Sequence, residues 1–451
     1  MMNRPIIMST ALILSGVAAL GQQPVKLITL DPGHFHAALV QKSMYPQVDP
    51  EVHVYAPAGP DLQMHLDKIN GYNSAATNPT RWKEIVYTGN DYLQRMLQEK
   101  KGNVVVLAGN NRLKTDYILS SVKAGFNVFA DKPMAIDQTG FEKLKQAFIT
   151  AERNKVLLYD IMTERYEITT ILQRAFSMEP SVFGTLQKGT AEQPAVTKES
   201  VHHFYKYVSG AVLTRPAWFF DVSQEGEGIV DVTTHLVDLV QWECFPDVTL
   251  DYLKDIHIDN AKSWPTIISK AQFTEVTKNE ALPAYLKKRS DAKGNISVLS
   301  NGEINYTIKG VHAKVSVIWN YKAPEGTGDT HYSIMRGSKA NLVIRQAAEQ
   351  QYKPTLYIEP LAPGAAYERS VQEIVDKINK QYKGVSLKKN AKGWEVIIPE
   401  QFKEGHESHF ARVTEKYLEY LSKHNMPSWE VPNMIAKYYT TTKAQQLATK
   451  K

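Results

Sequence analysis

Two separated segments of the chain hold side chains suited to proton transfer. Lys132 lies in the tripeptide Asp-Lys-Pro at residues 131–133, directly after a run of strand-forming residues. Further along, the segment GEGIVDVTTHLVD contains Asp231, His235 and Asp238. On a helix, positions i, i+4 and i+7 share one face, so these three side chains are predicted to point into one cleft. Because histidine titrates near neutral pH, such a cleft favours general acid–base chemistry.

The residues before position 165 predict the element that carries Lys132. Short β-type runs alternate with segments of helical period, in which apolar residues recur on one face. Parallel strands joined by helices cross over right-handedly and bind ligands at their carboxyl ends. We therefore predict an α/β fold that begins with a parallel, Rossmann-type sheet. Its strands are expected at residues 25–30, 51–56, 84–88, 103–109, 127–130 and 156–160.

After residue 166 the pattern changes to longer alternating runs, at 306–321 and 340–346, and the helix-like stretch that holds His235 precedes them. This pattern predicts an α+β domain with a mostly antiparallel, open sheet. A charged, helical insert is expected near residues 272–292. The last hundred residues hold two helix candidates, at 367–382 and 409–424, and end in a polar tail.

The composition is that of a folded globular chain. Of the 451 residues, 43% are hydrophobic and 22% are charged, which argues against a disordered or coiled-coil chain. The formal net charge of +6 is small for this length, and Lys and Arg form no block of the kind that follows a nucleic-acid backbone. We therefore expect no nucleic-acid partner.

Residues 1–21 have the pattern of an export signal. Arg4 precedes an apolar stretch, and Ala19 and Gly21 provide small residues for cleavage. The stretch is shorter than the roughly 20 apolar residues that span a bilayer, and no cysteine follows it, so we expect neither a membrane anchor nor a lipid anchor. The single cysteine, Cys244, cannot form an internal disulfide. We predict an exported, periplasmic bacterial protein.

Two segments resemble the glucose–fructose oxidoreductase, inositol dehydrogenase and rhizopine-catabolism family, called Gfo/Idh/MocA. In that family a strand ends in Thr-Pro-Asn, a helix and Ala-Gly follow, and the next strand ends in Glu-Lys-Pro. Here residues 108–136 place Asn111, Ala-Gly at 124–125 and Asp-Lys-Pro at 131–133 in the same order and spacing. The second family segment, glycines followed by Asp, His and Asp, corresponds to residues 226–238.

The chain departs from the family pattern at three positions of the first segment, where Gly-Asn stands for Thr-Pro, Lys114 for a common His and Asp131 for Glu. The resemblance covers roughly residues 25–350, and the remainder looks like the carboxyl-terminal domain of the family's exported oxidoreductase branch. The predicted organisation is a signal peptide at 1–21, a dinucleotide-binding Rossmann domain at 22–165, an α+β substrate and oligomerisation domain at 166–350, and a C-terminal helical extension at 351–451.

The resemblance implies a nicotinamide-dependent oxidoreductase with a tightly held cofactor, acting on a hydroxyl of a sugar or glycoside, preferably the 3-hydroxyl, to give a keto-sugar. It assigns removal of the hydroxyl proton and stabilisation of the alkoxide to Lys132 and His235, while Asp231 holds substrate or orients the histidine. The implied cofactor contacts are Gly33, His34, Phe35, Asn111, Asp131 and Lys132, and the implied substrate contacts are Arg165, Tyr166, Arg215, Asp231 and Asp238.

The segment LITLDPGHFHAAL, residues 27–39, is the strand-to-helix turn that would bind the dinucleotide. A Gly-x-Gly-x-x-Gly loop uses its glycines for a tight turn, for approach of the diphosphate and for close packing of the helix. Asp31, Gly33 and His36 hold those positions here, so only the second glycine is kept. Asp31 followed by proline predicts a helix N-cap. Because Ala56 stands where an acid would bind the adenosine ribose, the choice between NAD and NADP stays open, with NAD preferred.

Two other functions stay open at this point. One is an NAD-dependent, redox-neutral glycoside hydrolase or lyase, in which transient oxidation acidifies the neighbouring C–H bond. The other is a carbohydrate-binding protein that kept the fold while the altered turn at Asp31 lost the cofactor. No metal is predicted, because His406 and His409 have zinc-binding spacing but lack a third ligand. The family commonly pairs through the open face of the second sheet, so the resemblance implies a homodimer or homotetramer.

Overall fold

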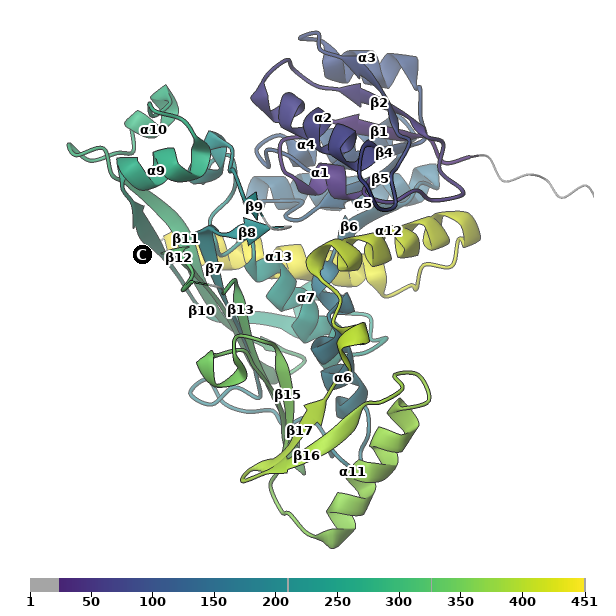
Figure 1. Cartoon of the computed structure of the whole chain (residues 1–451), viewed down its shortest axis with the longest axis vertical. Helices are drawn as coiled ribbons and strands as arrows, with labels where there is room; N and C mark the ends of the chain where they lie inside the picture. Colours follow the sequence, from purple (N-terminus) through teal and green to yellow (C-terminus); the bar gives the residue numbers. More distant parts are fainter. Residues whose placement is uncertain (1–23, 209–210, 326, 450–451) are drawn as a thin grey trace, which may run out of the picture.

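The computed structural model describes residues 24–208, 211–325 and 327–449, so the predicted export signal lies outside the described residues. The first domain, at the top of Figure 1, is built on a six-stranded parallel sheet with the order β3-β2-β1-β4-β5-β6. Its central strands are buried on both faces, which explains why their sequences are continuous apolar runs. All six predicted strands are confirmed: β1 Leu27–Leu30, β2 Glu51–Tyr55, β3 Lys83–Tyr87, β4 Val104–Leu107, β5 Asn127–Asp131 and β6 Leu158–Ile161.

The helix after the first strand is unusually short. This helix, α1, contains only His36–Leu39, and Asp31 does not cap it. Instead Asp31 has a φ angle of 48°, and its carboxylate accepts a hydrogen bond from the Tyr117 hydroxyl at 2.9 Å. The prediction that Asp31 begins the helix is therefore wrong, because Asp31 has a left-handed backbone conformation within the turn and its carboxylate binds Tyr117 instead of the helix N-terminus. The other helices of this domain are α2 Pro60–Asn73, α3 Tyr92–Glu99, α4 Lys114–Lys123 and α5 Gln138–Asn154.

The second domain is built on a nine-stranded sheet with the order β10-β11-β12-β7-β13-β14-β15-β17-β16, which runs down the left side of Figure 1. Only β12 and β7 pair in parallel, so the predicted mostly antiparallel sheet is confirmed. Its strands are β7 Val196–Tyr205, β10 Ile256–Ile268, β11 Ile296–Ile308, β12 Val311–Lys322, β13 Thr330–Arg336, β14 Ala340–Arg345, β15 Thr355–Pro360, β16 Ser386–Asn390 and β17 Gly393–Ile397, and a separate hairpin pairs β8 Tyr207–Val208 with β9 Ala211–Val212.

Helices of the second domain pack on this sheet, with α6 against β14 and β15 and α7 against β7 and β12. The predicted helical insert is present as α9 and α10. The helical elements are η1 Thr163–Tyr166, α6 Ile168–Ser177, η2 Ala217–Phe220, α7 Thr233–Cys244, α8 Tyr252–Asp255, α9 Lys270–Thr277, α10 Ala284–Lys287, η3 Ala348–Gln350, α11 Ala365–Ile378, η4 Glu400–Phe402, α12 His406–Lys423 and α13 Glu430–Thr449.

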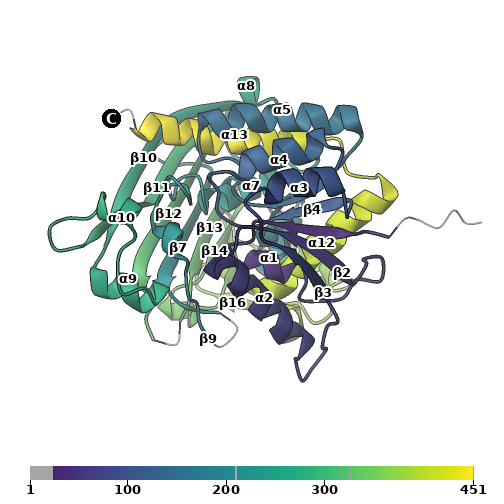
Figure 2. The ribbon, with the colours of Figure 1, turned by 90° about the horizontal axis from the view of Figure 1, so that it is seen from above.

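The last hundred residues differ from the predicted helical extension. β15, β17 and β16 continue the second sheet past the predicted boundary at residue 350. The two predicted helices are present as α11 and α12, but the predicted polar tail forms the 20-residue helix α13. This helix contacts α5 of the first domain and α7 and β10 of the second, and Figures 1 and 2 show it running between the two domains.

The C-terminal helices also complete the core of the first domain. Phe410 and Tyr417 of α12 and Met434 and Tyr438 of α13 are buried in the same apolar cluster as the strands β1, β4 and β5. The two domains and the C-terminal helices are thus packed as one unit around the carboxyl edge of the parallel sheet. Among the helices that the structure describes, none has the length and apolar character needed to cross a bilayer.

Candidate active site

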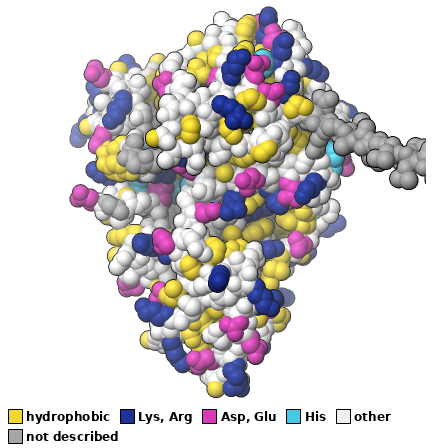
Figure 3. All heavy atoms as spheres, turned by 45° about the vertical axis from the view of Figure 1, so that its right-hand side comes forward, with side chains coloured by type: hydrophobic (Ala, Val, Ile, Leu, Met, Phe, Trp, Pro, Cys, Tyr) yellow, Lys and Arg dark blue, Asp and Glu magenta, His cyan; other side chains and the backbone are white. Residues whose placement is uncertain are grey.

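A cavity of about 690 Å³, called here the central cavity, lies between the carboxyl edge of the parallel sheet and the second domain. Lys132 follows β5, Asp231 lies in the turn before α7, and His235 lies in the first turn of α7. All three side chains line the central cavity, so the structure brings the predicted catalytic residues together. Figure 3 shows histidine side chains in the hollow beside the first domain.

Lys132 is held by an ion pair with Asp231, and both side chains are largely buried. Burial alone would lower the pKa of the Lys132 ammonium, but the charges of Asp231 and Asp131 outweigh burial and raise this pKa above its usual value. The same pair lowers the pKa of Asp231, although burial opposes this shift. Lys132 is therefore a cation at neutral pH.

His235 differs from Lys132 in charge, because its imidazole is neutral at neutral pH. Burial and the positive charge of Lys132 lower the pKa of His235 to about 3. Its Nδ1 atom is buried and has no hydrogen-bond partner among the described residues. A buried polar atom without a partner is costly, so a polar ligand in the central cavity would stabilise this side chain.

Two acidic residues of the central cavity were not among the predicted site residues. Burial and repulsion from Asp231 raise the pKa of Glu225 well above its usual value, and its side chain contacts Asn111. Burial and repulsion from Glu167 raise the pKa of Glu164 to about 7. Glu164 lies in η1, shortly after the end of β6, where a parallel sheet binds ligands. Its place after the sixth predicted strand is the feature of the sequence that could have identified it.

The pKa of Glu164 predicts the pH dependence of activity. Its carboxyl group is protonated below about pH 7 and ionised above it, so kcat/KM is expected to change across this pH. The Glu164→Gln variant should lose this step in a kcat/KM profile. Glu142→Gln, which alters a carboxylate that is 65% exposed, should keep it. An unchanged step in Glu164→Gln would assign the titration to another group.

Three of the predicted substrate contacts do not reach the central cavity. Asp238 and Arg165 are buried beside it and bind each other through two hydrogen bonds of 2.6 and 2.7 Å, while Tyr166 packs against the core of the first domain. The prediction of one helix face for the whole motif is therefore wrong, because Asp231 precedes the helix and the Asp238 carboxylate pairs with Arg165 and Lys437 instead.

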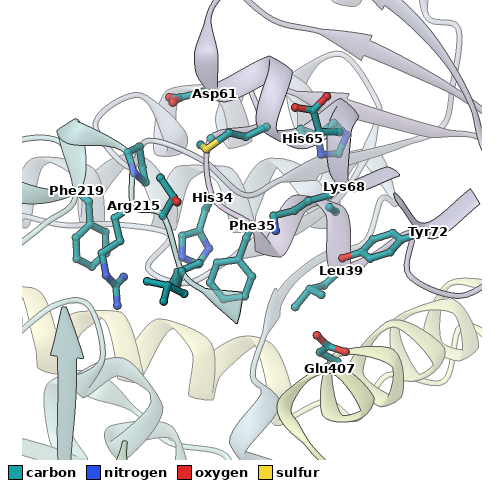
Figure 4. A pocket seen from close by; sticks show the side chains of 18 residues that line it. His34, Phe35, Leu39, Asp61, His65, Lys68, Tyr72, Arg215, Phe219 and Glu407 are labelled. Carbon is teal, nitrogen blue, oxygen red and sulfur yellow. The ribbon is translucent and has the colours of Figure 1, made fainter. Parts of the chain in front are cut away.

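Arg215 is the predicted substrate contact that does line the cavity, together with Asp231. Its guanidinium donates to the backbone carbonyls of Phe204 and His203 and lies over the ring of Phe219, 4.3 Å from the centroid. Arg215 and Phe219 also border an adjoining cavity of about 500 Å³, where they lie beside His34 and Phe35 in Figure 4. Aromatic rings next to fixed polar groups are typical of small-molecule sites.

The turn at residues 31–36 does not fit the diphosphate of a dinucleotide. The backbone N–H groups of Gly33 and His34, which a diphosphate would need, both donate to the carbonyl oxygen of Ala108 at 3.2 Å. The half-buried Asp31 carboxylate adds a group that repels phosphate when ionised, although burial raises its pKa.

Side chains crowd one side of Gly33, which also borders the adjoining cavity of about 500 Å³. A Cβ atom on this glycine would lie 3.1 Å from Oδ2 of Asp61 and 3.3 Å from the ring of Trp218. The Trp218 indole donates a 2.7 Å hydrogen bond to the same Asp61 oxygen, which locks the two side chains together.

The remaining predicted cofactor contacts serve other partners. The Asn111 side chain donates to the backbone of Glu225 at 2.7 Å and accepts from Lys114. The Asp131 carboxylate is buried against His34 and His36. The predicted cofactor residues are thus close together at the carboxyl edge of the sheet, but their polar groups contact protein.

Removing the Asp31 side chain should improve dinucleotide binding. Asp31 already has the positive φ that glycine adopts without strain, so Asp31→Gly fits the backbone and restores the first glycine. Loss of the carboxylate is expected to tighten NAD binding about tenfold, which corresponds to about 1.4 kcal/mol. Isothermal titration with NAD checks this.

The matched control for that change is Asn78→Gly, because Asn78 has a similar φ of 50° and is exposed on the protein surface. It should leave NAD binding as in the natural chain. Equal affinities for Asp31→Gly and the natural chain would show that Asp31 does not oppose the diphosphate.

Comparison with known proteins places this fold and site in a family. Residues 172–449 match the family model described as "Putative oxidoreductase C terminal domain", and residues 64–160 match "Oxidoreductase family, NAD-binding Rossmann fold". The chain therefore belongs to the Gfo/Idh/MocA oxidoreductases, in the branch with this C-terminal domain, and its first domain has the Rossmann fold of that family. The match to the Rossmann model begins at residue 64, which lies after the 31–36 turn.

Solved structures agree with this assignment. A crystal structure of a "putative oxidoreductase" from Parabacteroides merdae is 56% identical, with a TM-score of 0.92 over 95% of this chain and 98% of the other. Levoglucosan dehydrogenase in complex with NADH and levoglucosan is 12% identical, with a TM-score of 0.59 over 94% and 97% of the two chains. Biliverdin reductase from Synechocystis, in complex with biliverdin and NADP+, is 11% identical, with a TM-score of 0.55 over 94% and 99%. A search of curated proteins gave no match.

Proposed function

We propose that this protein oxidises a hydroxyl group of a sugar or glycoside. The observation that supports this most is the grouping of the Lys132 ammonium, the Asp231 carboxylate and the neutral His235 imidazole in the central cavity. In this arrangement His235 accepts the hydroxyl proton and Lys132 stabilises the alkoxide that forms. Asp231 orients Lys132 through their ion pair.

A polyhydroxylated substrate suits the other residues of the central cavity. Ser200, His202 and Lys206 offer hydroxyl, imidazole and ammonium groups on one wall, and Trp319 offers an aromatic surface beside them. Fixed polar groups around an aromatic ring can orient a sugar ring and select one hydroxyl. We propose the 3-hydroxyl of a glycoside as the reacting group, and we retain the exported, periplasmic location and the homo-oligomer as parts of this proposal.

Oxidation also needs a hydride acceptor, and NAD or NADP is the acceptor class of this family. Because the 31–36 turn does not fit the diphosphate, dinucleotide binding is the decisive measurement. Native mass spectrometry of the purified full chain should detect a bound dinucleotide, and incubation with glucosides plus each dinucleotide should give a keto-sugar. A folded protein that yields neither a dinucleotide complex nor a keto-sugar would contradict the proposal.

The 31–36 turn, whose N–H groups are bonded to protein, favours a second candidate function, that of a carbohydrate-binding protein that has lost the cofactor. The donated N–H groups of Gly33 and His34 and the Trp218–Asp61 contact are the observations in its favour. This candidate predicts glycoside binding by titration calorimetry without any dinucleotide complex or product. Formation of a keto-sugar excludes it.

A further inference from the structure

We propose that His34, His36 and Asp131 form a binding site for one divalent transition-metal ion, with zinc as the representative ion. Each of the three side chains offers one ligand atom, and these atoms all lie within 4.8 Å of one another. Two imidazoles and one carboxylate are a ligand set found in catalytic zinc sites and in non-haem iron sites. This inference goes beyond the oxidation proposed above and does not depend on a dinucleotide.

The distances around Asp131 suit a metal ion. Nδ1 of His36 lies 3.0 Å and Nδ1 of His34 lies 3.4 Å from the same oxygen, Oδ2 of Asp131. Ligand atoms about 2.0–2.2 Å from a tetrahedral zinc ion are roughly 3.3–3.5 Å apart. The 3.4 Å spacing falls within this range, and the 3.0 Å spacing would have to lengthen by about 0.3 Å for His36 and Asp131 to bind the same ion.

His34 provides a second, independent indication. Its Nδ1 atom is buried and makes no hydrogen bond to any described residue, although Asp131 is close to it. Buried polar atoms in proteins nearly always have a partner, so this nitrogen calls for an explanation. A metal ion between His34 and Asp131 would bind the free nitrogen and the carboxylate together.

His406 of the C-terminal helix α12 contacts the ring nitrogen of His36 that is not used for the metal. Nε2 of His36 lies 3.0 Å from Nε2 of His406, which is the first residue of α12. If Nδ1 of His36 binds the metal, its Nε2–H donates to His406, and such outer hydrogen bonds orient metal-binding histidines. His406 is therefore a positioning residue. The proposed ion is not bound by His406 and His409, the pair with zinc-binding spacing in the sequence, but by His34, His36 and Asp131.

The proposed ion would face the central cavity. His34, His36 and His406 line this cavity beside Lys132 and His235, whereas the Asp131 carboxylate lies beneath them and is 3% exposed. A site with three protein ligands keeps an open position for water or a substrate oxygen. The ion would thus take an oxygen ligand next to the Lys132–Asp231 pair. His36 occupies the position of the third glycine of a dinucleotide loop, so the same replacement that disturbs the turn creates the site.

Metal binding by the full chain tests this directly. After treatment with a chelator, titration with Zn²⁺ should show one site per chain, and Co²⁺ should give the visible absorption of a nitrogen- and oxygen-bound ion. His36→Ala and Asp131→Asn are expected to weaken binding by about 100-fold or more, and His406→Ala by about 10–100-fold. His257→Ala changes a histidine that is 78% exposed and serves as the control with unchanged binding.

Thermal unfolding monitored by circular dichroism shows which variants are folded, and His406→Ala tests the proposal if a ligand variant does not fold. The proposal is overturned if the natural chain binds neither Zn²⁺ nor Co²⁺ at the one site. It is also overturned if folded His36→Ala and Asp131→Asn bind these ions as tightly as the natural chain. In both cases the cluster is a group of imidazoles packed around one carboxylate.

Discussion

Replacing Lys132 with alanine is expected to lower kcat for oxidation of a glycoside by about 100-fold to 10,000-fold, the usual contribution of a proton-transfer or charge-stabilising group. The reason is that Lys132 stabilises the alkoxide in the proposed arrangement, and its pair with Asp231 holds it in the central cavity. Steady-state kinetics that separate kcat from KM check this, because loss of binding alone would change KM.

The control for this prediction is Lys143→Ala, which removes a lysine that is 41% exposed and pairs with Asp116 on the surface. It should leave kcat unchanged. Because Asp231 stays buried in Lys132→Ala, Lys132→Gln is a second variant that keeps a hydrogen-bond donor for the carboxylate. If folded Lys132→Gln and Lys132→Ala both retain kcat within about tenfold, Lys132 has no role in the chemistry.

The sequence predicts the parts of the fold that depend on local pattern. The strands β1 to β6 follow from buried apolar runs separated by helical periods, and Gly125, with a φ of 89°, ends α4 as its type suggests. Lys132 and His235 could be placed in one site because strand ends of a parallel sheet share one edge and because both family motifs keep their spacing. Each of these features depends on a short stretch of neighbouring residues.

The features of the site that the sequence did not predict depend on contacts between distant segments. His36 and His406 are 370 positions apart, and nothing in either local sequence indicates that their imidazoles meet. Trp218 lies close to Gly33 and is bonded to Asp61, 157 positions earlier, and nothing in the local sequence indicates that these two side chains crowd this glycine. A short motif predicts which residue types are present, but tertiary packing decides whether a ligand can reach them.

Helix α13 shows a second reason why part of the fold could not be predicted from the sequence. A helix is recognised by apolar residues on one face, but α13 buries Lys437, Thr440, Thr441 and Thr442 along with a few apolar residues. Their polar groups are satisfied inside the protein, for example by the 2.7 Å pair of Lys437 with Asp160. A helix stabilised in this way has the composition of a polar tail, so hydrophobic periodicity alone could not find it.

The same buried polar groups lead to a stability prediction. Asp238→Ala is expected to lower the free energy of unfolding by about 3 kcal/mol, because three hydrogen bonds to buried cations are lost, although Arg165 keeps Glu430 and Lys437 keeps Asp160. Asp238 accepts from Arg165 at 2.6 and 2.7 Å and from Lys437 at 2.8 Å, and Lys437 is 0% exposed. This network joins η1, α7 and α13, so its loss should separate the C-terminal helix from both domains. Urea unfolding measures the change.

Asp376→Ala is the matched control, because Asp376 is exposed on α11 and contacts only Gln372 among the hydrogen bonds of the described residues. Its effect should stay within about 0.5 kcal/mol. A loss in Asp238→Ala no larger than in Asp376→Ala would mean that the network contributes nothing to stability.

The pH dependence of stability gives an independent measurement of the same network. Burial alone would raise the pKa of Asp238, but Arg165 and Lys437 outweigh burial and hold it well below its usual value. A pKa that is lower in the folded chain than in the unfolded chain, where it is about 3.9, adds stability above that pH, and this stability is lost as the pH falls through the folded pKa. The natural chain should therefore lose stability below about pH 4 more steeply than Asp238→Asn, which has no such carboxylate to protonate. If the free energy of unfolding falls equally with pH in the two proteins, the charge of Asp238 does not contribute to the stability of the network.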